Sequence, residues 1–140
     1  MYVVDSSVFL SGFLNYEPYH KESLKCLVYF KENPSISLFL PELLIPEVGC
    51  IVARMIKNPK LGVDFANSLR EFTNFKFIPI DRHIADLSLK IGTLLFLRGA
   101  DAIYVALAYN FNSTLISLDK EHLKKAKKLI KVIHPKDFHF

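Results

Sequence analysis

Cysteine is scarce in this chain. Its 140 residues include two cysteines, Cys26 and Cys50, and they form no CxxC motif. A disulfide framework needs several cysteines, and a cysteine-based zinc site needs them at short spacing. Both arrangements are therefore excluded, and we expect Cys26 and Cys50 to be buried thiols.

Long hydrophobic runs are also missing. A transmembrane helix needs about 20 consecutive apolar residues, whereas the longest apolar stretch, from Ile36 to Ile45, is interrupted by Pro41 and Glu42. The residues after Met1 lack the basic region and apolar segment of a secretory signal. The sequence predicts a cytoplasmic protein with no membrane span.

Several common catalytic motifs are absent. The chain has no GxSxG, no phosphate-binding P-loop and no HxH or HExxH pattern, and its five glycines are isolated. The histidines are scattered along the chain: His20, His83, His122, His134 and His139. A metal site or catalytic triad built on histidine is not expected.

Apolar runs of strand length alternate with segments of helical spacing. With 51% hydrophobic residues, the chain can bury the core of one domain spanning residues 1–140. The predicted strands are 2–4, 36–40, 75–79, 114–117 and 131–133. The predicted helices are 20–31, 43–57, 61–72, 84–97, 100–111 and 121–129. The alternation predicts an α/β fold with a central, mostly parallel sheet of four to five strands sandwiched by helices, with a helical pair added at one edge.

Positive charge is concentrated near the C-terminus. The formal net charge is +4, but Lys120–Lys136 contains seven Lys and one Glu, so the rest of the chain carries a net −2. This asymmetry favours docking of a polyanion on the C-terminal segment. The alternative is the solvated face of an amphipathic helix that turns Leu123, Ala126 and Leu129 inward.

Four acidic residues lie where carboxylates are uncommon. Asp5 and Asp119 each follow a predicted strand, where the carboxyl ends of parallel strands collect ligand-binding groups. Glu47 lies in a segment that is hydrophobic on nearly all sides and is expected to be buried, and Asp101 is the only charged residue between Gly99 and Asn110. Each has a structural alternative as a helix N-cap or first-turn residue. Together, crowded carboxylates predict a hard divalent cation such as Mg²⁺ or Mn²⁺.

These residues form a recognisable series in the order Val3-Val4-Asp5-Ser6-Ser7, Pro46-Glu47-Val48, Arg98-Gly99-Ala100-Asp101-Ala102-Ile103 and Leu115-Ile116-Ser117-Leu118-Asp119. The series resembles the PIN-domain nucleases, and within them the VapC-like toxins of toxin–antitoxin pairs. The resemblance extends from Tyr2 to about Leu123.

The resemblance implies a site and a reaction. Asp5, Glu47, Asp101 and Asp119 would surround Mg²⁺ or Mn²⁺ and hydrolyse an RNA phosphodiester through a metal-bound water. The resemblance also implies two further sets of residues: one that positions the acids and one that contacts RNA phosphates. The supports are Ser7 and Ser117, and the RNA contacts are Arg98, Lys124, Lys125, Lys127 and Lys128. For Arg98, pairing with a carboxylate is the alternative. The expected partners are RNA, a cognate VapB-like antitoxin and a second copy of the chain.

The aromatic residues after the first strand allow two interpretations. Phe9, Phe13, Tyr16 and Tyr19 could pack in the core, or they could stack on bases or contact an antitoxin helix. Antitoxin and dimer contacts are expected at residues 12–29 and 47–72.

Three other functions were considered. The first two are an RNA-processing nuclease outside a toxin pair and a catalytically silent PIN-fold module that binds RNA or protein. The third is a phosphatase of the haloacid-dehalogenase type, which requires a second Asp two residues after the first. Ser7 occupies that position, so this function is disfavoured.

Overall fold

The computed structural model describes all 140 residues and contains one five-stranded sheet with the strand order β3-β2-β1-β4-β5. All four strand pairs are parallel. The strands are β1 (Tyr2–Val4), β2 (Leu38–Pro41), β3 (Phe75–Ile78), β4 (Thr114–Ile116) and β5 (Val132–Ile133). The α-helices are α1 (Ser6–Phe13), α2 (His20–Glu32), α3 (Leu44–Ile56), α4 (Pro59–Ser68), α5 (Arg82–Leu95), α6 (Gly99–Asn110) and α7 (Lys120–Lys125). Three short 3₁₀ helices are η1 (Leu69–Glu71), η2 (Ala126–Lys128) and η3 (Pro135–Asp137).

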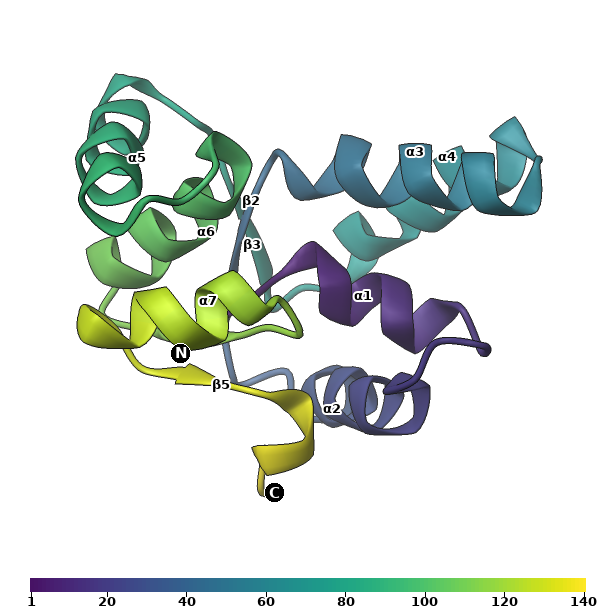
Figure 1. Cartoon of the computed structure of the whole chain (residues 1–140). Coiled ribbons are helices and arrows are strands. Elements are labelled where there is room, and N and C mark those ends of the chain that lie inside the picture. The colour runs from purple at the N-terminus through teal and green to yellow at the C-terminus, as the bar shows by residue number, and fades with distance from the viewer.

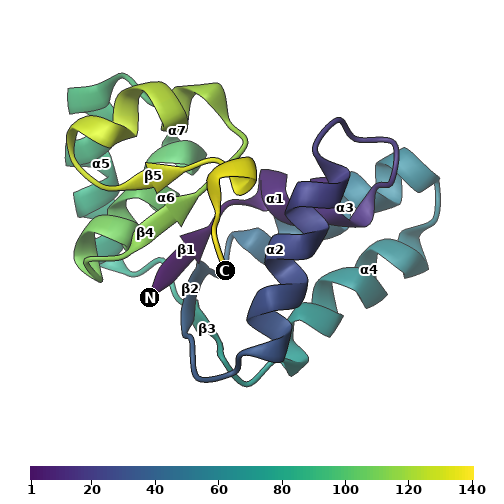
Figure 2. The same ribbon diagram turned by 90° about the horizontal axis from the view of Figure 1, so that it is seen from below.

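The helices form two layers around the sheet, α1 to α4 on one side and α5 to α7 on the other (Figures 1 and 2). From β1 the chain moves outward to β2 and β3, returns to β4 beside β1, and continues outward to β5. Right-handed crossovers in opposite directions put their helices on opposite faces. The predicted α/β class is confirmed. The chain adds strands on one side of β1 and then on the other, so the strand order reverses between β1 and β4.

Strands β1 and β4 form the buried centre of the sheet. Val3 pairs with Leu115 and Val4 with Ile116, and all four side chains are fully buried. Parallel strands covered on both faces are hydrophobic along their length, as these are. Because both strands run in the same direction, the residues that follow them, including Asp5 and Asp119, lie together at the carboxyl ends of the strands.

Helix α6 packs across the middle of the sheet. Its buried alanines, Ala102, Ala106 and Ala108, allow close approach to the strands, and Tyr104 is 1% exposed among them. This packing directs the first turn of α6 toward the carboxyl edge of β1 and β4.

Helix α1 is missing from the predicted elements. Its eight residues include three serines and a glycine, which are weak helix formers. Tertiary packing stabilises it: Val8 and Phe9 are buried, and a Cβ on Gly12 would lie 2.7 Å from Leu27 Cδ1 on α2. Such long-range contacts leave no local signal in the sequence.

Two expectations about burial were wrong. Cys26 is buried but Cys50 is exposed. Helix α3 buries only Leu44, Val48 and Val52, because it packs on one side against α4 and leaves the other side in solvent. The α3–α4 pair connects β2 to the edge strand β3, as the predicted helical pair requires.

The remaining boundaries agree with the predictions to within a few residues, except that α7 ends at Lys125 and continues as η2. No single helix is long and apolar enough to cross a membrane. Helices α5 and α6 reach the length and hydrophobicity of a membrane span only when they are counted together, and the chain bends by 110° between them.

Candidate active site

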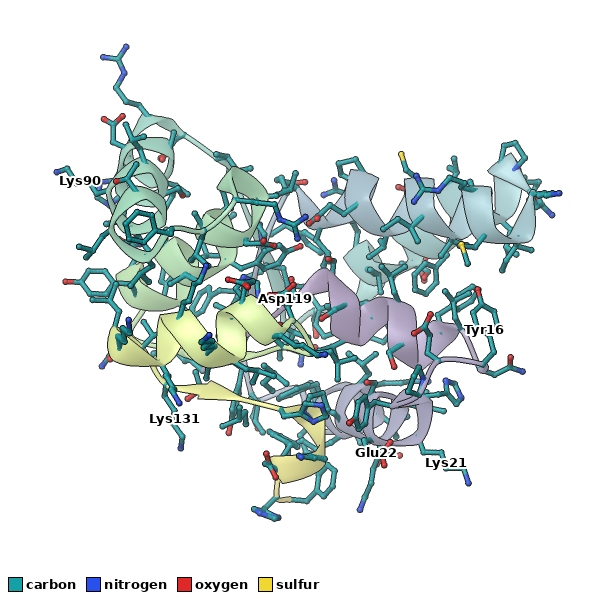
Figure 3. All side chains as sticks on the ribbon, viewed as in Figure 1. Tyr16, Lys21, Glu22, Lys90, Asp119 and Lys131 are labelled. Atoms are coloured by element: carbon teal, nitrogen blue, oxygen red, sulfur yellow. The ribbon has the colours of Figure 1, made fainter.

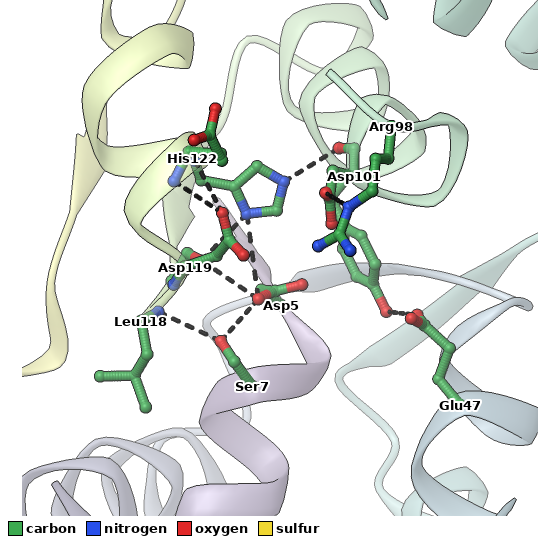
Figure 4. A network of polar contacts seen from close by, with 11 residues as sticks. Asp5, Ser7, Glu47, Arg98, Asp101, Leu118, Asp119 and His122 are labelled. Carbon is green, nitrogen blue, oxygen red and sulfur yellow. Dashed lines mark hydrogen bonds and ion pairs between the residues drawn. The ribbon is translucent and has the colours of Figure 1, made fainter. Parts of the chain in front are cut away.

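Asp5 is the most buried of the four acids, with 4% of its surface exposed. It occupies the N-cap position of α1 without a side-chain capping bond. Its Oδ2 instead accepts hydrogen bonds from Ser7 Oγ at 2.5 Å and Ser117 Oγ at 3.1 Å (Figure 4). Burial raises the pKa of Asp5, while His122 and the two hydroxyls act in the opposite direction.

The two serines connect the ends of β1 and β4. Ser7 Oγ accepts a hydrogen bond from the Leu118 amide at 3.1 Å, and Ser117 Oγ accepts one from the Asp119 amide at 2.9 Å. Each hydroxyl therefore orients the Asp5 carboxylate and also holds the turn that carries Asp119.

Asp119 is the N-cap of α7. Its Oδ1 accepts hydrogen bonds from the amides of Glu121 at 2.8 Å and His122 at 3.0 Å. The capping interpretation is thus correct for this residue. The capping bonds engage one carboxylate oxygen, and Asp119 still acts on its neighbours because its charge raises the pKa of Asp5.

Glu47 lies in the first turn of α3, where the helix dipole favours an acid. The Tyr104 hydroxyl donates a hydrogen bond to its Oε1 at 2.6 Å. Burial raises the pKa of Glu47, the bond from Tyr104 lowers it, and the charges of Asp5 and Asp101 raise it. Three of the four acids therefore interact electrostatically across the crevice.

Asp101 lies in the first turn of α6, and Arg98 occupies the N-cap position. The capping interpretation of Asp101 is thus wrong. Arg98 Nε donates a hydrogen bond to Asp101 Oδ2 at 3.2 Å, and the side chains are 82% and 17% exposed, respectively. Arg98 is a carboxylate partner in this structure, with most of its side chain open to a ligand.

His122 is a residue of this site that the sequence analysis missed. It is fully buried, with Nδ1 3.0 Å from Ser117 Oγ and Nε2 3.0 Å from the Asp101 carbonyl oxygen. Its Nδ1 also lies 3.9 Å from Asp5 Oδ2. The imidazole thus joins α7, the end of β4 and the first turn of α6 (Figure 4). Its position in the turn after Asp119 was the available signal.

Replacing His122 with Phe should preserve the ring volume and remove both ring hydrogen bonds. If these acids hold a metal for RNA cleavage, as the family resemblance implies, the cleavage rate should fall about 10- to 100-fold, the usual cost of losing a residue that orients metal ligands. A matched variant, His83→Phe, changes a histidine bonded to Asn110 on the surface and should retain full activity. Equal activity of both variants would show that His122 only fills space.

The structure does not bring the predicted RNA-contact lysines together. Lys125 forms an ion pair with Glu121 and lies by the acids, in a cavity lined by Arg98 and Asp101. Lys127 and Lys128 line a different cavity, beside residues that begin β4 and precede β5. Lys124 is exposed on α7.

The four acids lie near one another where β1 and β4 end (Figure 4), but their carboxylates do not form a ready-made ligand shell. No group of three or more His, Cys, Asp or Glu side chains is close enough together to hold a metal ion. Glu47 and Asp101 are turned to Tyr104 and Arg98. The donors are nevertheless hard oxygens suited to Mg²⁺ or Mn²⁺, and the hydrogen bonds to Asp5 end on Oδ2, leaving Oδ1 pointing toward the other acids (Figure 4). The residues present fit such a cation.

Comparison with known proteins supports this description of the fold. The family model described as PIN domain matches residues 2–129. Among solved structures, FitAcB from Neisseria gonorrhoeae aligns with a TM-score of 0.73 and 18% identity over 99% of this chain and 100% of that chain. VapBC2 from Rickettsia felis, bound to a promoter DNA fragment, aligns with a TM-score of 0.71 and 10% identity over 95% and 97% of the two chains.

A third structure is VapC20 from Mycobacterium tuberculosis, a sarcin–ricin loop cleaving toxin. It aligns with a TM-score of 0.67 and 13% identity over 86% of this chain and 91% of that chain. No curated protein matches the sequence. At these identities the structural matches show a shared fold.

Proposed function

The chain belongs to the PIN domain family, and from that premise we propose that it is a metal-dependent endoribonuclease acting as the toxin of a VapBC-type pair. The observation that carries this proposal is the convergence of Asp5, Glu47, Asp101 and Asp119 at the carboxyl edge of β1 and β4. The similarity to toxins such as VapC20 supports the choice of RNA as substrate.

In the proposed reaction, Asp5, Glu47, Asp101 and Asp119 would hold Mg²⁺ or Mn²⁺. The ion, when bound, supplies Lewis acidity toward the phosphodiester and lowers the pKa of water. Ser7 and Ser117 keep the Asp5 carboxylate oriented. Arg98 lies over the acids with an exposed guanidinium that can bind a phosphate oxygen.

A metal titration of RNA cleavage tests the proposal. Wild type is incubated with total RNA and increasing Mg²⁺ or Mn²⁺, beside Asp101→Asn and an EDTA blank. We expect cleavage that requires the metal and is lost in Asp101→Asn, together with a metal-induced rise in the Tm of wild type. Absence of both cleavage and thermal shift would favour the catalytically silent module.

The lysine-rich segment is proposed to contact RNA phosphates in addition to Arg98. Lys124, Lys125, Lys127 and Lys128 lie on α7 and η2, which begin at the crevice with Asp119. In Figure 3, Asp119 is central and Lys131, beyond η2, is peripheral. An RNA strand leaving the crevice along this path would meet successive cations.

The antitoxin is proposed to bind a groove between α1, α2, α4 and η1. This cavity of about 290 Å³ has an almost entirely apolar lining that includes Phe9, Phe13, Leu24, Leu27 and Phe65. The apolar face of an amphipathic helix would fill it. The groove overlaps the residues at which the sequence analysis expects antitoxin contacts.

Groove variants test that partner. Leu24 is 42% exposed and lines the groove, whereas Val63 is 58% exposed and does not. Leu24→Glu should weaken binding of the proposed VapB-like antitoxin at least about tenfold, since a charge would be buried, and Val63→Glu should not. Equal affinity of both variants would exclude the groove.

A second copy of this chain is the remaining proposed partner. Leu89 and Leu94 on α5 are each 66% exposed and offer an apolar surface for a homodimer. Both proposed partners, RNA and antitoxin, are consistent with a cytoplasmic protein.

A further inference from the structure

Phe96 stands out among the apolar side chains at the surface. It is 84% exposed, more than any other large hydrophobic residue of the chain. It follows the last residue of α5 and precedes Arg98 by two positions. A single exposed apolar side chain is common at protein surfaces, so a role for Phe96 must be argued from its backbone and its neighbours.

The backbone of Phe96 strengthens this point. Its φ of 56° and ψ of 44° are left-handed, and it is the C-cap of α5. Glycine normally occupies such a position, because any Cβ is strained there. The chain therefore holds a bulky aromatic residue where a glycine would be more stable, which is typical of functional positions.

Phe96 lies beside the candidate active site. Phe96 lines a cavity of about 310 Å³ together with Leu97, Arg98, Asp101, Glu121 and Lys125. One of these, Asp101, is a candidate metal ligand, and two are cations. Lys125 Nζ donates a hydrogen bond to the Phe96 carbonyl oxygen at 3.0 Å, which ties this strained turn to α7.

We propose that Phe96 is a stacking platform for an unpaired RNA base adjacent to the scissile phosphate, with Arg98 and Lys125 contacting the neighbouring phosphates. The proposal rests on the proposed nuclease function and identifies a residue that would contact a base next to the cleaved bond. Unpaired bases stack on aromatic rings and guanidinium planes, and bases within a duplex are not available for such stacking. The cavity is at the lower end of the size range of small-ligand pockets.

Three variants of Phe96 separate stacking from folding. Phe96→Gly removes the ring and relieves the backbone strain, so it should raise the Tm while lowering kcat/KM on single-stranded RNA about 5- to 150-fold, the range for loss of one base–aromatic stack. Phe96→Ala should lower kcat/KM similarly, and Phe96→Trp should retain it. Phe140, 55% exposed and packed against Tyr29 and Lys25, provides the control: Phe140→Gly should leave kcat/KM unchanged.

A substrate scan completes the test. On an oligoribonucleotide that wild type cleaves, single abasic sites are introduced on either side of the cut. One position should reduce wild-type kcat/KM by about the factor seen for Phe96→Gly, and should have no further effect in that variant.

The outcomes are distinct. Additive losses at every abasic position, or a Phe96→Gly variant as active as wild type, would overturn the stacking role while leaving the nuclease intact. Loss of activity accompanied by a change of oligomeric state would instead assign Phe96 to a subunit interface and also overturn it. If wild type cleaves no RNA, the proposed function itself fails.

Discussion

Replacing Asp5 with Asn is expected to abolish RNA cleavage, by at least about a thousandfold, without unfolding the protein. Asn retains the shape and can still accept the hydrogen bonds from Ser7 and Ser117, but it lacks the charge that a divalent cation requires. The cleavage assay with Mg²⁺ or Mn²⁺ measures this directly. A variant that cleaves at the wild-type rate would remove Asp5 from the site.

The same variant should be more stable than wild type in EDTA at neutral pH. Burial raises the pKa of Asp5 above its value in the unfolded chain, so the ionised carboxylate costs folding free energy. The folded protein then binds more protons than the unfolded one between those two pKa values, and its stability rises as pH falls through that interval.

Asp5→Asn should lose this contribution, while that of Glu47, whose pKa is raised in the same direction, remains. Measuring Tm against pH in EDTA for both proteins tests the sign. A lower Tm for Asp5→Asn at neutral pH would mean that the Asp5 charge stabilises the metal-free fold, contrary to this account.

The closely packed contact between α3 and α4 should make the protein's stability sensitive to a single added methyl group. Gly62 lies at the contact between α3 and α4, where an added Cβ would be 2.4 Å from the Gly49 carbonyl oxygen and 2.7 Å from Ala53 Cβ. Neither neighbour can rotate away, so the helices must separate. Gly62→Ala should therefore lower the free energy of unfolding by about 2 to 4 kcal/mol, measured by urea denaturation.

Gly99→Ala is the matched control for this substitution. Gly99 is also helical, but a Cβ there meets nothing within 4 Å. Alanine should stabilise α6 by about 0.5 to 1 kcal/mol. If Gly62→Ala and Gly99→Ala unfold at the same urea concentration, the α3–α4 contact tolerates more separation than its geometry indicates.

Much of the site could be predicted because it follows from strand direction. The apolar runs that end at Asp5 and precede Asp119 are local signals, and parallel pairing brings their carboxyl ends together. Asp101 was also visible as the single charge in the otherwise apolar segment that forms α6.

Not all partners of these acids could be predicted in the same way. Ser117, which bonds to Asp5 across 112 positions of sequence, was expected only from the family resemblance, and Tyr104, which bonds to Glu47 across 57 positions, was not expected. His122 had one local signal, its position in the turn after Asp119, but its burial depends on contacts with Ser117 and with the first turn of α6. The side chain of Phe96 was likewise unremarkable until its left-handed backbone and its exposure were known.

The separation of Asp5 and Asp119 along the chain has a consequence for synthesis in the cell. These residues are the first and last of the four acids in chain order, and β4 must pair with β1 before they can meet. At about 5 to 20 residues per second, a ribosome needs roughly 6 to 23 s to progress from one to the other. During that time the nascent chain has no assembled catalytic centre, so a nuclease of this design would not attack the messenger or ribosome that is producing it.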